Sequence, residues 1–461
     1  MHQKQFNQDG NRNNDVVSRY EDMLYQQKIG YFDVEEFESL TEYYLNHMKV
    51  KKSLLVVEEG LKQHPGSITL LLWQARVLHK MGKYNSALGI IETLSFKIYD
   101  EEVLMLEGEL LLRMDKFQAA NDVFENLLKT SDDDIDRMCL DIAFLYMGIQ
   151  QPNVALYYLK KGLMHNPFNI DILFELALNS EENGKSDLAI TYLNQLLDVD
   201  PYNEEAWYNM GMSHNSNEDY DKAVDAFDYA LVIDSGFYNA IFQKGIALLR
   251  QDKFQEALDS FQEFLKAETH NEEVLIYLAE CYEGLGDYVS AEQTYYSILE
   301  SEPDVYDAWI GLGYCKQSTK DYIESVNCFK KAIEMDETDD EAWTGMAESY
   351  FYSGFKKEAS EAFTKSLKLN PEQEDVWVML IALRIENNEL EEARSALGMA
   401  ISIVGDNESL LELKRLLDIL VSGEYANIHV TRENASDLIF KGERFNMVNL
   451  SKFIDPDQYK N

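Results

Sequence analysis

Apolar residues recur along most of the chain at every third or fourth position, which is the period of an α-helix with one buried face. In residues 340–352, for example, Trp343, Met346, Ala347 and Tyr350 fall on one side of a helix. Each such stretch is followed by a short polar break and by a second stretch with the same period. The pattern therefore predicts an all-α fold built from pairs of antiparallel helices joined by short turns.

The paired helices repeat with a period of 34 residues. Trp309, Trp343 and Trp377 are spaced by this period, and Trp207 lies three periods before Trp309. Sixteen residues after each Trp comes a small side chain, and four residues later a large apolar one. We expect the two helices of a pair to cross at the small residue, where the backbones can approach closely. The small and large residues are Ala223 and Phe227, Ser325 and Phe329, Ala359 and Phe363, and Ala393 and Leu397.

The periodic region divides into eleven repeats over residues 34–407. One repeat is a residue short, and Ile135 is an extra residue between two repeats. A single repeat cannot bury its apolar faces alone, so neighbouring repeats must stack into one continuous core and form an α-solenoid. The predicted repeats are 34–67, 68–100, 101–134, 136–169, 170–203, 204–237, 238–271, 272–305, 306–339, 340–373 and 374–407.

The two ends of the chain depart from the repeat. Residues 15–33 and residues 408–420 have a helical pattern, and we expect each to cap one end of the array by covering its exposed apolar face. Residues 1–14 are rich in Asn, Gln and Asp, which predicts a disordered arm. Residues 421–461 form a nearly neutral tail that carries the segment IFKGERF at 439–445, a candidate cap or docking peptide.

Glycine and proline mark the predicted turns and repeat boundaries. Glycine about fifteen residues into a repeat permits the left-handed backbone that ends a helix. These glycines are Gly82, Gly184, Gly286 and Gly354. Five of the seven prolines share one position near the end of a repeat, where each stops the second helix. These are Pro65, Pro167, Pro201, Pro303 and Pro371, and the residues expected to cap the following helix are Asn169, Asn203, Asn271 and Asp339.

This pattern resembles the tetratricopeptide repeat family, whose consensus combines W-x₂-L-G-x₂-Y, A-x₃-F and a late proline. The stretches around the four tryptophans read AWYNMGMSH, AWIGLGYCK, AWTGMAESY and VWVMLIALR. The match is weaker in the first two repeats, at Thr41 and Gln74, and in the last repeat, at Ile381 and Gly405. The resemblance implies a right-handed superhelix in which the first helix of each repeat lines a concave surface.

The resemblance also implies which residues bind partners. In this family the second, fifth, ninth and twelfth positions of the first helices are exposed on the concave surface. The residues that we predict to bind a partner are Phe174, Tyr208, Met212, Phe242, Ile246, Ile276, Glu280, Ile310, Tyr314, Glu348 and Phe351. Residues at the twelfth position include Glu181, Glu283 and Gln317.

The chemistry of these positions favours one kind of partner. Aromatic and aliphatic side chains alternate with carboxylates, which suits an amphipathic segment with basic and apolar residues. The positions hold no cluster of Lys or Arg, which the family's co-chaperone members use to bind an acidic peptide. The alternative interpretation is that some of the apolar residues pack between adjacent first helices.

The overall charge narrows the classes of partner further. The chain has 461 residues, 41 Lys and Arg against 83 Asp and Glu, and a formal charge of −42. Such a field repels nucleic acids and anionic membrane surfaces. No apolar run predicts a signal peptide or a membrane span, and the four cysteines form no CxxC pair. We therefore expect a cytoplasmic protein.

No motif predicts a catalytic or cofactor site. The GKS triplet at residues 184–186 has Asn179 where a phosphate-binding loop needs glycine, and no strand precedes it. Cys315 and Cys328 without further ligands do not make a zinc site. We therefore predict a scaffold or adaptor without enzymatic activity, cofactor or metal. Two alternatives stay open, namely a peptide-responsive regulatory receptor and an accessory subunit of an enzyme.

Overall fold

A computed structural model gives the structure of the chain, and the fold class predicted from the sequence, an all-α solenoid, is confirmed. The structure describes residues 15–26, 30–95, 100–131, 134–267, 271–405 and 407–422. The predicted arm at 1–14 and the segment 439–445 of the predicted tail lie outside these residues.

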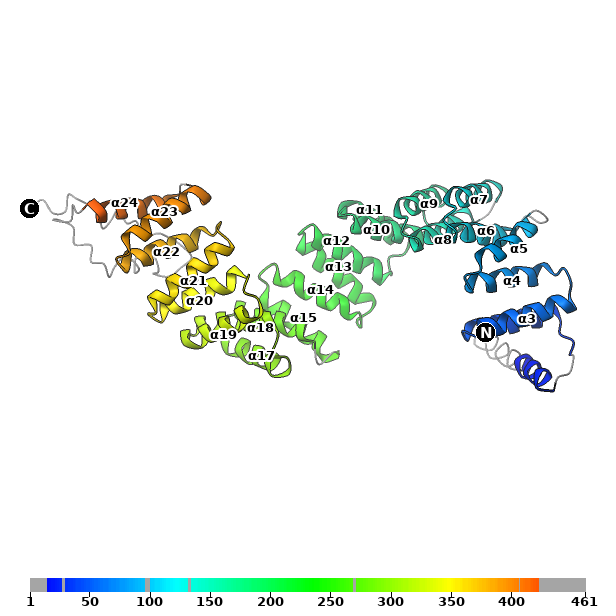
Figure 1. Ribbon diagram of the computed structural model, residues 1–461, viewed down its shortest axis with the longest axis horizontal. Helices are drawn as coiled ribbons and strands as arrows, with labels where there is room; N and C mark the ends of the chain where they lie inside the picture. Colours follow the sequence, from blue (N-terminus) through cyan, green and yellow to red (C-terminus); the bar gives the residue numbers. More distant parts are fainter. Residues whose placement is uncertain are drawn as a thin grey trace, which may run out of the picture. The chain divides into compact units, whose positions relative to one another are not determined.

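The chain divides into two compact units, and the division falls between Ser213 and His214. In the first unit, a helix over residues 15–26 precedes the paired helices. Each helix of a pair packs on the other, as α8 and α9 do in Figure 1, and first helices of neighbouring pairs also touch. The helices are α2 (Val34–Asn46), α3 (Val50–Gln63), α4 (Ile68–Lys80), α5 (Tyr84–Ser95), α6 (Glu101–Arg113), α7 (Phe117–Thr130), α8 (Ile135–Gly148), α9 (Pro152–His165), α10 (Ile170–Glu182), α11 (Ser186–Val199) and most of α12 (Glu204–Ser216).

The second unit is built in the same way. Its helices alternate between first and second members of a pair, and α20 and α21 lie side by side in Figure 1. The helices are α13 (Tyr220–Ile233), α14 (Tyr238–Leu249), α15 (Phe254–Ala267), α16 (Glu272–Gly284), α17 (Tyr288–Ser301), α18 (Tyr306–Ser318), α19 (Tyr322–Met335), α20 (Asp340–Tyr352), α21 (Lys356–Leu369), α22 (Glu374–Glu386), α23 (Leu390–Val404) and α24 (Glu408–Ser422).

The caps predicted for the first helices are confirmed. Each predicted residue accepts a hydrogen bond from a backbone N–H in the first turn of the next helix, which satisfies a donor that the helix itself leaves unpaired. The acceptor and donor residues are Asn169 and Ile172, Asn203 and Ala206, Asn271 and Val274, and Asp339 and Glu341. Ile135, the residue outside our repeat count, is the first residue of α8.

The turn between the two helices of a pair contains one residue with a left-handed backbone. Gly82, Gly184, Gly286 and Gly354 have φ between 65° and 84°, as predicted. In the other turns a residue with a side chain adopts φ between 56° and 65°. These are Met48, Asp115, Gln150, Glu218, Asp252, Lys320 and Asn388. A left-handed backbone costs a residue with a side chain about 1–2 kcal/mol, so helix packing must outweigh this cost.

Gly354→Ala is expected to lower the free energy of unfolding by about 1 kcal/mol. A Cβ at this position meets no atom within 4 Å, so backbone strain at φ +84° is the cause. Gly398→Ala in α23 is the matched control, because a Cβ at this position also meets no atom within 4 Å. Here the backbone is helical, and a helix interior favours Ala over Gly by about 1 kcal/mol. Urea unfolding followed by circular dichroism should give shifts of opposite sign. Equal shifts would contradict the explanation.

Aromatic rings of the second helices lock neighbouring repeats together. Phe329 on α19 is fully buried, and its ring lies against Gly313 of its own repeat and Gly345 of the next. A Cβ on Gly313 would lie 2.8 Å from the ring, and one on Gly345 would collide with it. The ring also meets Tyr314 edge to face, with centroids 5.2 Å apart. The glycines therefore make room for a ring that joins α18, α19 and α20.

Helices with one apolar face cover both ends of the described repeats. Before α2, Val16, Val17 and Tyr20 are buried and pack in one cluster with residues of α2 to α4. At the other end, α24 packs on α22 and α23. Its buried side chains are Leu410, Leu413, Leu416 and Leu417.

Candidate partner-binding face

The residues predicted to bind a partner lie on the first helices α10, α12, α14, α16, α18 and α20. Phe174, Tyr208 and Met212 belong to the first unit, and the other eight belong to the second. Ten of the eleven side chains are half-buried, and Glu280 is exposed. We refer to the eight residues of the second unit as the first-helix face. They are Phe242, Ile246, Ile276, Glu280, Ile310, Tyr314, Glu348 and Phe351.

Several apolar residues of the first-helix face also pack against neighbouring helices. The Phe242 ring lies 6.0 Å from Phe261, 5.6 Å from Phe264 and 5.8 Å from Tyr277, measured between centroids. Ile310, Tyr314 and Phe351 likewise pack against one core cluster, as Ile246 and Ile276 do against two others. The structure thus supports the alternative that these apolar residues pack against neighbouring helices, although only with part of each side chain, since each is half-buried and half in solvent.

Glu280 is a carboxylate in an unfavourable setting. Its side chain reaches solvent, yet the protein around it desolvates the carboxylate and raises its pKa. Arg250 opposes this shift and Asp307 on α18 adds to it. Within the described residues Glu280 forms no salt bridge, so its charge has no direct counter-ion.

Glu348 on α20 is desolvated more strongly. Burial raises its pKa to about 7, and the charge of Asp375 adds to the rise. A hydrogen bond from Gln317 on α18 opposes it. The Gln317 amide also donates to the Gly345 carbonyl oxygen at 2.8 Å and to Ser349 Oγ at 2.9 Å, so its position is fixed. No salt bridge reaches Glu348 within the described part of the chain.

Tyr314 connects α18 to α20, the helix that carries Glu348. Its hydroxyl donates to Glu341 Oε1 at 2.9 Å, and burial together with the charges of Glu341 and Glu348 raises its pKa. The hydroxyl therefore stays protonated as a hydrogen-bond donor. Carboxylates and half-buried aromatic rings thus occur together on α16, α18 and α20.

In the first unit, several carboxylates of the first helices contact a neighbouring first helix. Carboxylates of α2 and α6 bind donors and cations of α4, and the Arg76 guanidinium also lies 4.9 Å from the Trp73 ring centroid. The pairs are Glu38 with Trp73, Arg76 with Glu102, and His79 with Glu109.

The twelfth-position residues that we expected to be exposed are half-buried and bind neighbouring helices. Glu181 accepts hydrogen bonds from Ser213 at 2.8 Å and Ser186 at 3.1 Å. Glu283 accepts one from the Tyr295 hydroxyl at 2.6 Å. These carboxylates are therefore part of the packing between helices and are not available to a partner.

Comparison with known families fits this architecture. Models of the tetratricopeptide repeat family match residues 174–236, 248–312, 306–339 and 340–373. The chain is a tetratricopeptide repeat protein. Such repeats typically serve as non-catalytic scaffolds, which supports a role in protein–protein interaction in general. No curated protein matches the chain in sequence.

Several solved structures are similar to the chain at low sequence identity. The Cut9–Hcn1 hetero-tetramer of APC/C is 13% identical, with a TM-score of 0.41 and coverage of 84% of this chain and 96% of that chain. A tetratricopeptide repeat protein from Parabacteroides merdae ATCC 43184 is 20% identical, with a TM-score of 0.44 and coverage of 54% and 98%. YrrB, described as having an unusual peptide-binding site, is 19% identical, with a TM-score of 0.34 and coverage of 39% and 93%.

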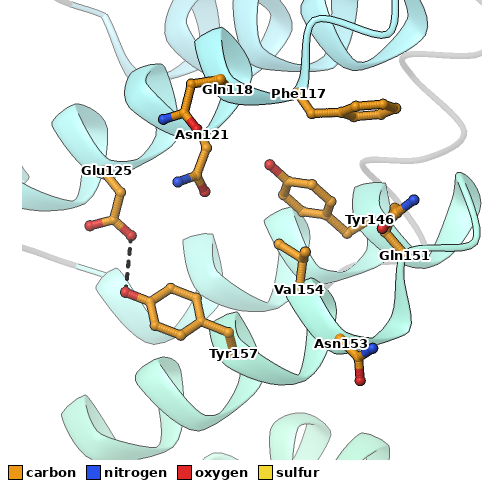
Figure 2. Close-up of a pocket in the computed structure, with 9 residues that line it drawn as sticks. All are labelled: Phe117, Gln118, Asn121, Glu125, Tyr146, Gln151, Asn153, Val154 and Tyr157. Atoms are coloured by element: carbon orange, nitrogen blue, oxygen red, sulfur yellow. Dashed lines mark hydrogen bonds between the residues drawn. The ribbon is translucent and has the colours of Figure 1, made fainter.

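A cavity of about 550 Å³ lies in the first unit, between α7, α8 and α9 (Figure 2). Aromatic rings of Phe117, Tyr146 and Tyr157 line it together with several amide side chains. Its carboxylate, Glu125, accepts a hydrogen bond from the Tyr157 hydroxyl at 3.3 Å and pairs with Lys161 at 2.8 Å. The charge of Glu125 is therefore already balanced, and the cavity offers no site for a cation.

Other kinds of site find no support in the described residues. No group of three or more His, Cys, Asp or Glu there could hold a metal ion. No helix among them is both long and apolar enough to cross a membrane. Burial raises the pKa of Cys139 to about 11 and that of Cys281 and Cys328 to about 12, which makes these thiols poor nucleophiles.

Sequence reasoning missed Tyr277, which belongs to the same surroundings as Glu280. Its ring stacks on Phe261 with centroids 5.6 Å apart, and the charges of Glu273 and Glu280 help to raise its pKa after desolvation. Tyr277 is the sixth residue of its repeat, a position that the family resemblance does not mark as exposed. An aromatic residue at a position that elsewhere holds Gly311 and Gly345 was the available signal.

Proposed function

We propose that the chain is a scaffold that holds a partner protein through a basic and partly apolar segment on the first-helix face. The observation that supports this most is the pair of desolvated carboxylates, Glu280 and Glu348, which have no salt bridge within the described residues. A Lys or Arg from a partner would supply the missing counter-ion. The half-buried rings of Phe242 and Tyr314 would cover the apolar part of such a segment.

Charge favours this class of partner over acidic ones. The formal charge of −42 attracts a basic segment over a distance and raises its rate of association. The same field disfavours nucleic acid and anionic lipid. We place this role in the cytoplasm, where the four buried free thiols would stay reduced.

Removing the two carboxylates is expected to weaken binding of a basic amphipathic probe by at least about tenfold. The probe is an acetylated, amidated peptide with the sequence Lys-Leu-Lys-Lys-Leu-Leu-Lys, titrated calorimetrically into the full chain and its Glu280→Gln/Glu348→Gln variant. A matched control, Glu263→Gln/Glu300→Gln, removes two exposed charges from second helices. We expect this control to lose less than about threefold, from the general field alone.

The pH dependence gives a second readout of the same titration. A bound cation favours the ionised form of Glu348, so affinity should rise as pH passes through about 7 in the wild type. Glu348→Gln should remove this rise. Equal losses in the face variant and the control variant, with no rise near pH 7, would rule out the first-helix face as the binding surface.

A further inference from the structure

A second cavity in the second unit collects positive charge in a strongly acidic chain. It has a volume of about 540 Å³ and lies between α20, α21 and α22. Trp343, Met346 and Tyr350 form its apolar part, and its cations are Lys365, Lys368 and Arg384. Glu358 and Glu361 also line it, so three cations face two carboxylates in its lining.

The cations of this cavity have no carboxylate partners. Within the described residues neither Lys365 nor Lys368 forms a salt bridge, although acids outnumber bases by 83 to 41 in the chain. Arg384 donates to two uncharged acceptors, Thr364 Oγ1 and the Glu392 carbonyl oxygen, each at 3.2 Å. The guanidinium is thus held in place while its charge stays uncompensated.

The aromatic residues hold the cations beside the apolar part of the cavity. Lys365 Nζ lies 5.9 Å from the Trp343 ring centroid, and Lys330 Nζ lies 5.5 Å from that of Tyr350. These cation–π contacts keep the ammonium groups near the rings without neutralising them. The Trp343 indole N–H donates to the Glu337 carbonyl oxygen at 3.1 Å, which fixes the ring.

This cavity is separate from the first-helix face. Trp343, Met346 and Tyr350 fall on one side of α20, because residues three and four positions apart share a helix face. Glu348 and Phe351 also lie three positions apart and share a side of the helix. Because an α-helix turns by about 100° per residue, this side differs from the one that carries Trp343, Met346 and Tyr350. A ligand in the cavity and a segment on the first-helix face could therefore occupy α20 at the same time.

We propose that this cavity binds an acidic peptide segment of a partner protein. A carboxylate of the segment lies among Lys365, Lys368 and Arg384, and a neighbouring aliphatic side chain covers Trp343. Charge complementarity selects the acidic class, because unpaired cations beside an apolar wall satisfy both parts of such a segment. The chain then has two surfaces of opposite charge preference and can bring a basic and an acidic partner together.

The test uses a ligand that the overall charge of the chain repels. The acetylated, amidated pentapeptide Glu-Glu-Leu-Glu-Glu is titrated into the full chain, with Gln-Gln-Leu-Gln-Gln as the neutral probe. Because the chain carries −42, non-specific electrostatics favour the neutral probe. We expect the acidic probe to bind more tightly despite this field.

Two double variants locate the site. Lys365→Gln/Lys368→Gln should weaken binding of the acidic probe by about tenfold. Lys331→Gln/Lys357→Gln removes the same charge from exposed positions of α19 and α21 that do not line the cavity, and should change the affinity by less than about twofold. All four lysines are exposed, and circular dichroism verifies that each variant folds.

Two results would overturn the proposal. One is an acidic probe that binds no better than the neutral probe, and the other is an equal loss in both lysine variants. Glu280→Gln/Glu348→Gln should leave binding of the acidic probe unchanged or slightly stronger. Failure at the cavity is thereby distinguishable from failure at the first-helix face.

Discussion

Phe329→Ala is expected to lower the free energy of unfolding of the second unit by about 3–5 kcal/mol. The ring is fully buried, and its removal leaves a cavity bounded by two helix backbones at Gly313 and Gly345. Neither glycine has a side chain that could fill the space. Relaxation would require the helices themselves to move, so we expect a loss near the upper end of the range for this substitution.

Native-state hydrogen exchange measures this loss where it arises. A loss of about 3 kcal/mol should speed exchange of the most protected amides of α18, α19 and α20 by at least about 100-fold. Phe355→Ala is the control, because its ring is 45% exposed and stands at the start of α21. We expect it to cost less than about 1 kcal/mol. Comparable losses in the two variants would show that the ring does not join the repeats.

Glu348→Gln is expected to stabilise the second unit at pH 8 relative to the wild type, by roughly 2–3 kcal/mol more than at pH 4.5. The folded-state pKa of about 7 lies above 4.5, the ordinary pKa of a glutamate side chain. Between these two values the folded wild type binds a proton that the unfolded chain has released. Its stability is therefore fully present below about pH 4.5 and declines as pH rises through 7. Glutamine has no proton to lose and keeps its stability.

The measurement is the difference between the two unfolding free energies as a function of pH, so that titrations shared by both proteins cancel. Glu372→Gln, an exposed residue between α21 and α22, is the control. It removes one carboxylate from an exposed position and so controls for the loss of a charge. A constant difference for Glu348→Gln would show that the carboxylate is not desolvated in the folded chain.

Local chemistry made much of the fold predictable from the sequence. Ser325 Oγ donates to the Gly313 carbonyl oxygen where α19 crosses α18, and Asn169 caps α10, because both contacts join residues that are close together in the chain. The turn at Lys320 was not predictable in this way. Its left-handed backbone follows from the packing of the two helices and not from the residue.

The candidate site was less predictable, because it depends on contacts between repeats. The sequence gives no sign that Arg76 pairs with Glu102 in the next repeat while Glu348 has no cation. It also does not show that Glu181 accepts a hydrogen bond from Ser213. Position in the repeat identifies candidates for exposure, and the side chains of the neighbouring repeat decide which charges remain available.

The leucine-rich helix α24 has a consequence for how such a chain changes over evolutionary time. It buries Leu410, Leu413, Leu416 and Leu417 against the last pair, as the helix at 15–26 does with its own residues against the first. Duplication or deletion of the gene segment for one interior repeat would leave both terminal helices in place, and every new contact between repeats would resemble an existing one. Loss of α24 would instead expose an apolar surface to which other copies of the chain could bind. Interior repeats are interchangeable in this sense, whereas the terminal helices are not.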